Sequence, residues 1–370
     1  MGALDRKLIR DVWRLRGQVL AIAFVIASGV AVLVMSLSAI EALETTGDAY
    51  YERYSFADVF AGVERAPEKL ANRIARIPGV QNVETRIVKF ATIDIAGFEE
   101  PVIGQLVSIP VGNQPILNRL ALRSGRLISP GRPDEVVLSE PFALEHELLP
   151  GDQLKVVMNG KKRTLDIVGI ALSPEYVYTI GPGQLLPDEK RFGILWMSRN
   201  ALEAAYDLDG AFNDVSLTLQ RGASVDDVVS RLDTLLDRYG GVGAFARSDQ
   251  TSNFFLENEI AQLRSIVSIL PAIFLAVAAF LTNVVIARLI AIERAEIGLM
   301  KAFGYGNISV GWHYAKMVIV MAGIGILIGW FAGAWFGRFN TQFYAEEIFR
   351  FPFLLFRPSP TVFVLSGAIS

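Results

Sequence analysis

Three uncharged, mostly apolar stretches divide the sequence. They cover residues 18–40, 265–287 and 317–337, and none contains Asp, Glu, Lys, Arg or His. A helix of ~20 apolar residues is long enough to cross the hydrocarbon layer of a bilayer. One such stretch can be a buried helix of a soluble protein, but three indicate an α-helical membrane protein. Residues 361–370 are apolar but too few to cross, and are expected to begin a fourth span of a longer natural chain.

A basic segment, residues 1–17, precedes the first apolar stretch, as it would in a signal peptide. The apolar run is longer than the ~7–15 residues of a signal-peptide core, so it is interpreted as an uncleaved anchor. The basic segment is itself amphipathic, because Leu4, Leu8, Val12 and Leu15 share one helical face. This pattern predicts a helix lying on the inner leaflet. A simple basic flank of the anchor is the alternative.

An internal repeat marks the two ends of the long segment 41–264. Phe56-Ala-Asp58-Val59 matches Phe212-Asn-Asp214-Val215, and each copy is read as a strand followed by a helix and a second strand. The helices are expected at residues 67–76 and 224–239, and the second strands at residues 81–90 and 242–247. Two strand–helix–strand halves predict one α+β domain built from both ends of the segment.

The segment between the two halves, residues 91–200, is interpreted as a β-rich insertion. Short alternating runs at residues 135–138, 153–158 and 163–170 are separated by turn signals. Asn159-Gly160, between the last two runs, is a strong signal for a two-residue hairpin.

The charge distribution predicts the orientation in a bacterial inner membrane. Short loops rich in Lys and Arg stay in the cytoplasm, whereas long domains translocate largely regardless of charge. Residues 1–17 and 288–316 are short and rich in Lys and Arg, so both are expected inside, with a cytoplasmic N-terminus. Residues 41–264 carry 23 basic and 32 acidic side chains and are expected outside, as is the loop 338–360. The expected fold is thus an α-helical multi-pass membrane protein with an α+β extracytoplasmic domain.

Four glycines recur every four residues along the third apolar stretch, and we call them the glycine ridge. They are Gly325, Gly329, Gly333 and Gly337. This spacing puts them on one face of a helix, where another helix can approach closely. The alternative is that glycine is simply common in membrane helices.

The helical pattern of the second apolar stretch continues into residues 288–316, which we call the elbow. The helix is expected to run without a break to about Phe303 and to stop near Gly304, and Asn307 is expected to cap another short helix. The charged side chains at this end have no evident partner elsewhere in the chain. Such a stiff helix can carry movement across the membrane. The alternative interpretation of this segment is a charged loop exposed to solvent.

No catalytic constellation is present. The chain has no Cys and only two His, which stand in no metal-ligand spacing. No G-x-x-x-x-G-K-[ST] phosphate loop occurs, and no charge lies inside an apolar stretch, which argues against an ion path. The chain is therefore not expected to be an enzyme, to hold a cofactor or to bind nucleic acid.

Residues 293–304, Glu-Arg-Ala-Glu-Ile-Gly-Leu-Met-Lys-Ala-Phe-Gly, resemble the R-x-E-I-G-x-x-[KR]-A-x-G signature of FtsX-like, MacB-type permeases of ABC transporters. The order of apolar stretches around a long outer domain is similar too. Three further motifs resemble the family's periplasmic core, namely Ser124-Gly125-Arg126, Glu135-Val136-Val137-Leu138-Ser139 and Leu149-Pro-Gly151-Asp152.

This resemblance implies a permease subunit that couples ATP hydrolysis to movement of the outer domain, for export, extraction or mechanotransmission. Its partners would be a separate cytoplasmic ABC ATPase that binds the ATP, the lipid bilayer, and a second permease unit, either a homodimer partner or a duplicated half. The implied ATPase-docking residues are Glu293, Arg294, Glu296, Ile297, Lys301 and Gly304. The alternative function is a transmembrane sensor with an extracytoplasmic ligand domain. The sequence does not identify the substrate that such a permease would move.

Overall fold

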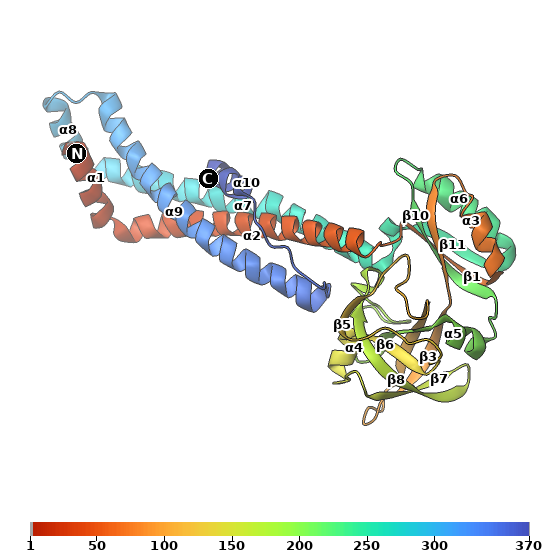
Figure 1. The fold of residues 1–370 in the computed structure, drawn as a ribbon. Helices are drawn as coiled ribbons and strands as arrows, with labels where there is room; N and C mark the ends of the chain where they lie inside the picture. The colour runs from red at the N-terminus through yellow and green to blue at the C-terminus, as the bar shows by residue number, and fades with distance from the viewer. Residues whose placement is uncertain (1–2, 370) are drawn as a thin grey trace. The chain divides into compact units, whose positions relative to one another are not determined.

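The computed structural model describes residues 3–369, with side chains from residue 6 on, so the side chains of residues 1–5, Leu4 among them, and of residue 370 lie outside the account. The chain forms two compact units. The helical unit holds the described residues up to Thr45, Glu259–Tyr344 and those from Leu354 on. The globular unit holds Thr46–Asn258 and Ala345–Phe353 (Figure 1).

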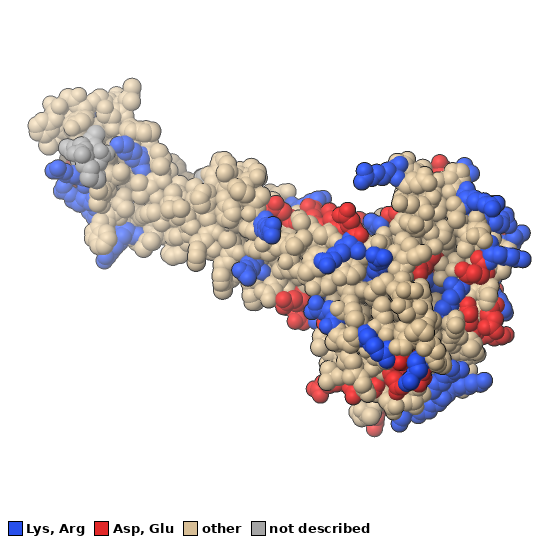
Figure 2. Space-filling model, in the orientation of Figure 1, with Lys and Arg blue, Asp and Glu red and all other residues tan. Residues whose placement is uncertain are grey.

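Three helices of the helical unit are long and apolar enough to cross a membrane, by length and composition. They are α2 (Arg16–Arg53), α7 (Thr251–Ile292) and α9 (Asn307–Phe343), the last continuing as a π-turn to Ile348. Shorter helices are α1 (Ala3–Arg14), α8 (Arg294–Ala302) and α10 (Pro360–Ile369). Uncharged side chains cover most of the helical unit on the face in Figure 2, and Lys and Arg gather near its N-terminal end. The three uncharged stretches thus lie inside the three long helices, and the chain is a membrane protein.

The elbow differs from the expected continuous helix in two places. The helix breaks at Glu293, whose backbone leaves helical geometry with φ −87° and ψ 17°. Asn307 is the first residue of α9 rather than its cap, because Gly306 takes the capping position. From Asn307 one helix continues into the third apolar stretch, so no separate short helix forms. Interactions of the Glu293 side chain, described below, account for the break.

One four-stranded antiparallel sheet joins the two ends of the globular unit, in the order β11-β1-β10-β2. Its strands are β1 (Val59–Pro67), β2 (Val80–Arg86), β10 (Ala211–Leu219) and β11 (Gly241–Ala246). Short helices η1 (Glu68–Leu70) and α3 (Ala71–Ile74) follow β1, and α6 (Val225–Leu236) follows β10. The second strand of each half pairs with the first strand of the other half. The repeat therefore builds one interlocked α+β core.

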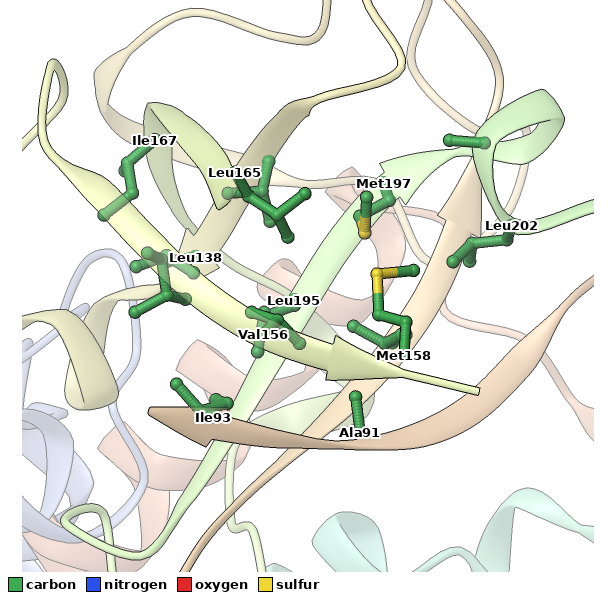
Figure 3. Packing of buried hydrophobic residues seen from close by; sticks show 14 of the residues in the cluster. Ala91, Ile93, Leu138, Val156, Met158, Leu165, Ile167, Leu195, Met197 and Leu202 are labelled. Atoms are coloured by element: carbon green, nitrogen blue, oxygen red, sulfur yellow. The ribbon is translucent and has the colours of Figure 1, made fainter. Parts of the chain in front are cut away.

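The insertion forms a mixed sheet that closes on itself. Its order is β5-β8-β6-β9-β4-β3-β7, and β7 also pairs with β8. The strands are β3 (Val88–Asp94), β4 (Val102–Ile109), β5 (Ala121–Gly125), β6 (Glu135–Ser139), β7 (Gln153–Met158), β8 (Lys161–Leu172) and β9 (Phe192–Ser198), with helices α4 (Glu140–Glu145) and α5 (Arg199–Tyr206). Apolar side chains such as Leu138, Val156, Leu165 and Leu195 fill its interior (Figure 3). Closure leaves few strand edges free for wrong pairing.

Two sequence expectations for this unit have different outcomes. Asn159 and Gly160 both have positive φ, 46° and 75°, and join β7 to β8 as the two-residue hairpin expected. The strand expected at residues 81–90 is instead two strands, β2 and β3, in different sheets. The break falls at Ile87, whose N–H donates to Ser108 Oγ at 2.8 Å. The alternating pattern runs through this break and hides it.

An ion pair connects the motif Ser124-Gly125-Arg126 with the motif that begins at Glu135. Arg126 Nη1 and Nη2 donate to the Glu135 carboxylate at 2.8 and 2.7 Å, and Ser129 N–H donates to it at 2.8 Å. Glu135 is buried whereas Arg126 is half-exposed. The hydrogen bond from Arg126, together with that from Ser129, outweighs burial and lowers the pKa of Glu135 to about 2.

The globular unit should therefore lose stability in acid. The ordinary pKa of Glu is ~4.3, so the stabilisation from the lowered pKa is present above that value and is lost as the pH falls toward 2. Because Arg126 is half-exposed, we expect a loss of only about 1–2 kcal/mol. Thermal unfolding of the full chain in detergent, followed by circular dichroism between pH 7 and 3, should show a smaller acid-induced shift in Glu135→Gln. An equal shift in both proteins would contradict this account.

Candidate functional site

The break in the elbow is held by a buried carboxylate. Glu293 is only 3% exposed, and its Oε2 accepts hydrogen bonds from Lys7 Nζ and from Tyr314 Oη, both at 3.0 Å. Lys7 lies on α1 and Tyr314 on α9, so three separate segments meet at this side chain. A buried charge needs such partners, because an unpaired one is costly.

Lys7 is the centre of this group of side chains. Its Nζ lies 2.8 Å from Asp11, 3.0 Å from Glu293 and 3.0 Å from Glu296. Burial opposes the charge of Lys7, but hydrogen bonds to the three carboxylates outweigh it and raise the pKa of Lys7, so it stays protonated. The buried His313 adds a contact between its Nε2 and Asp11 Oδ2 at 3.4 Å. We call these residues the Lys7 cluster: Lys7, Asp11, Glu293, Glu296, His313 and Tyr314.

The Lys7 cluster corrects one sequence inference, because the charged end of the elbow does have a partner in the chain. The prediction failed because Lys7 and Glu293 are far apart in sequence. The apolar face of α1 also has a protein partner, since Leu8, Val12 and Leu15 pack against the buried cluster of the helical unit. These contacts bury the three side chains only in part, and the expected position of this segment on the inner leaflet stays a prediction. Among the residues of α1 whose side chains the structure describes, Ile9 and Trp13 are exposed large apolar ones.

Residues 294–309 of the elbow are mostly exposed, unlike Glu293. Arg294 and Lys301 are exposed, and Ile297 packs partly against the helical core. Gly304 has φ +91°, which allows the turn after α8. The tip carries large exposed apolar side chains that were not singled out from the sequence, Leu299, Phe303 and Ile308 at 62, 76 and 89%. Their position beside the turn signal at Gly304 was the available clue.

The glycine ridge faces α2 within the same chain. A Cβ on Gly329 would lie 2.6 Å from Val30 Cβ, and one on Gly333 would lie 2.7 Å from Val34 Cβ. A Cβ on Gly325 would lie 2.8 Å from Ala23 O and from Ile26 Cβ. A Cβ on Gly337 would make an ordinary contact with Met35 at 3.4 Å. Three of the four glycines thus permit an approach of α2 that any side chain would prevent.

Groups of three or more His, Cys, Asp or Glu side chains placed to hold a metal ion are absent from the described residues. Of the two histidines, His313 belongs to the Lys7 cluster, and His146 Nε2 lies 2.9 Å from Lys190 O in the globular unit.

Comparison with known proteins gives one family match. Residues 268–370 match the family described as FtsX-like permease C-terminal. This range begins within α7 and covers α8, the elbow turn, α9 and α10. None of the curated proteins with which the chain was compared matches it.

Three solved structures resemble part of the chain at low similarity. The extracellular domain of the ABC-type transporter YknZ from Gram-positive bacteria is 15% identical, with a TM-score of 0.32, over 51% of this chain and 98% of that one. The periplasmic region of MacB from Actinobacillus actinomycetemcomitans is 12% identical, with a TM-score of 0.34, over 55 and 95%. A domain of a putative permease from Porphyromonas gingivalis is 12% identical, with a TM-score of 0.30, over 51 and 88%.

Proposed function

Because residues 268–370 form an FtsX-like permease domain, we propose that the chain is the permease subunit of an ABC transporter in a bacterial inner membrane. In this proposal a separate cytoplasmic ATPase binds and hydrolyses ATP, and the permease passes the resulting movement to the globular unit outside the membrane. The N-terminus and the elbow lie in the cytoplasm, because short segments rich in Lys and Arg stay on that side of the membrane. A second permease unit, as a homodimer partner or duplicated half, completes the assembly.

The exposed tip of the elbow is the observation that carries this proposal. Phe303 and Ile308 are more than three-quarters exposed, and Lys301 beside them is exposed too. Apolar anchors surrounded by charge are typical of protein contact surfaces. We infer that the ATPase docks on Arg294, Lys301 and the apolar tip. Glu293 and Glu296 act differently, by holding α8 to α1 through Lys7.

Movement at α8 has a direct route along α7 into the globular unit. Helix α7 continues from Ile292 back to Thr251, and at its start Gln250 Nε2 and Ser252 Oγ donate to Glu175 O at 2.8 and 2.9 Å. These bonds are buried. A displacement of the first turn of α7 therefore acts on Glu175.

Glu175 lies in η2 (Pro174–Tyr176), just after β8 of the closed sheet, and its carboxylate connects this point to the four-stranded sheet. Its carboxylate accepts from Arg86 Nη1 at 2.5 Å and from Asn118 Nδ2 at 2.9 Å. Arg86, at the end of β2, also donates to Asp214 on β10 at 2.8 Å. In the proposed mechanism this buried network distributes the movement of α7 over the α+β sheet and the closed sheet together.

Charge and apolar changes at the tip should separate docking from packing. Phe303→Asp should reduce co-purification of the ATPase by more than tenfold, because it places a charge where an apolar anchor is buried on docking. Lys301→Glu should cause a smaller loss that shrinks as salt is raised, since an exposed pair is screened. Co-purification from cells expressing both proteins, at low and high salt, measures both effects.

Lys69→Glu is the matched control, because it reverses the charge of an exposed residue in η1 of the globular unit. It should leave co-purification unchanged. Glu296→Lys is a less specific test, because it also places a second ammonium beside Lys7. Wild-type co-purification of both tip variants would show that the tip is not the docking surface.

A further inference from the structure

A loop of the globular unit presents two leucines to solvent. The leucine loop, residues 181–191, connects β8 to β9, and its Leu185 and Leu186 are 91 and 70% exposed. Leu144 on the neighbouring α4 is 61% exposed. Lys190 joins this helix to the loop, since its O lies 2.9 Å from His146 Nε2 and its Nζ lies 3.6 Å from Glu145. Adjacent exposed apolar side chains of this kind mark a surface that meets protein or membrane.

The loop is internally fixed on both sides of the leucines. Gly181 N–H donates to Gln184 Oε1 at 2.9 Å, and Gln184 N–H donates back to Gly181 O at 3.0 Å. After the leucines, Asp188 Oδ1 accepts from the backbone N–H groups of Lys190 and Arg191 at 3.2 and 3.3 Å. The outward position of the leucines is therefore built into the loop, which lowers the entropy cost of inserting them into another phase.

The loop is bonded to a segment that the membrane helices supply. We call Ala345–Phe353 the return segment; it packs in the globular unit, yet the residues on both sides of it belong to the helical unit. Arg350 donates to the Glu189 carboxylate at 2.9 Å, and Arg123 donates to Pro352 O at 3.2 Å. Phe349 is buried, which anchors the return segment further.

We propose that the leucine loop inserts Leu185 and Leu186 into the headgroup–acyl boundary of the membrane that α9 crosses. Helix α9 (Asn307–Phe343) continues through the π-turn Tyr344–Ile348 into the return segment, and the link from Phe353 to Pro360 of α10 reaches at most ~25 Å. Both ends of the return segment are therefore connected by short links to helices of the helical unit. Apolar side chains that stand at the headgroup–acyl boundary are stabilised there. The insertion rests on the membrane helices alone and needs no ATPase.

The charges of the loop give it no preference for anionic lipid. Lys190 lies beside Glu145, Arg191 beside Asp188, and Arg350 beside Glu189. Because opposite charges are paired, the loop offers no block of basic residues to attract anionic lipid. The expected contact is made by the leucines with acyl chains of any common phospholipid.

Site-specific quenching tests the insertion, and the absence of Cys from the sequence makes single labels unique. Leu185→Cys and Leu186→Cys, in the full chain in phosphatidylcholine nanodiscs, are labelled with a bimane. Phosphatidylcholine with a doxyl group high on the acyl chain should quench both labels several-fold more than a label at Asn159→Cys. Asn159, in the β7–β8 turn, has no bond to the return segment among the described residues, and it controls for insertion driven by the label.

Each variant should keep the wild-type thermal unfolding midpoint, which shows that the loop is intact. Quenching at positions 185 and 186 no greater than at position 159 would overturn the proposal. So would labels shielded from aqueous iodide but not reached by doxyl lipid, since a protein contact would then cover the loop. Either failure leaves the proposed permease function standing.

Discussion

Lys7→Met is expected to destabilise the helical unit by about 3 kcal/mol, the cost typical of removing one partner of a buried ion pair. Glu293 would keep its charge at 3% exposure and, among the described side chains, would retain Tyr314 as its one donor. Because Glu293 stands at the break between α7 and α8, the elbow should repack or open. The midpoint of thermal unfolding in detergent should fall, and ATPase co-purification should fall with it.

A second substitution makes the Lys7 test specific. Glu293→Gln removes the charge but keeps an oxygen that can accept from Tyr314, so Lys7→Met with Glu293→Gln should recover much of the loss. Arg10→Met removes a cation from an exposed position of the same helix and should have little effect. If the double variant is no more stable than Lys7→Met, the ion pair does not hold the elbow.

Gly329→Leu is expected to separate α2 from α9. A Cβ at this position already falls 2.6 Å from Val30 Cβ and 2.9 Å from the backbone oxygen of Ala27. Neither helix can yield without moving its backbone, so the cost should exceed the ~1–3 kcal/mol typical of overpacked cores. The variant should be depleted from the folded fraction after detergent extraction and should unfold at a lower temperature.

Gly323→Leu provides a matched control on the same helix. A Cβ at Gly323 meets nothing within 4 Å, so the same change in composition should be tolerated there. Gly329→Ala should give an intermediate effect, because it adds only the Cβ. Equal stability of Gly329→Leu and Gly323→Leu would show that the ridge does not set the approach of α2.

The elements recovered best from sequence are those with a local physical cause. A bilayer requires long uncharged stretches, and these lie inside α2, α7 and α9. The Asn159-Gly160 turn was predictable because both residues tolerate positive φ. The ends of the long helices were not, since α2 runs to Arg53 and α7 begins at Thr251 through polar sequence that carries no membrane signal.

Structural features that depend on residues far apart in the chain were not predicted from the sequence. The helix break at Glu293 depends on Lys7, and the division between β2 and β3 at Ile87 depends on Ser108. At the candidate site, the regular spacing of Gly325, Gly329 and Gly333 indicated close packing, but nothing local identified α2 as the neighbour. Periodicity shows which face of an element packs and leaves open which element it packs against.

The interlocked sheet of the globular unit has a consequence for how the chain is made. Central strand β1 pairs with β10 and β11, with Val59 opposite Leu217 and Ala246, so the first half has no partner strands until late in synthesis. Contacts so distant in sequence slow folding, and incomplete domains expose strand edges that aggregate. If the unit is exported as proposed, it crosses the membrane before its α+β core can form. The closed sheet, whose strands all lie between Val88 and Ser198, has its full set of partners earlier and is expected to fold first.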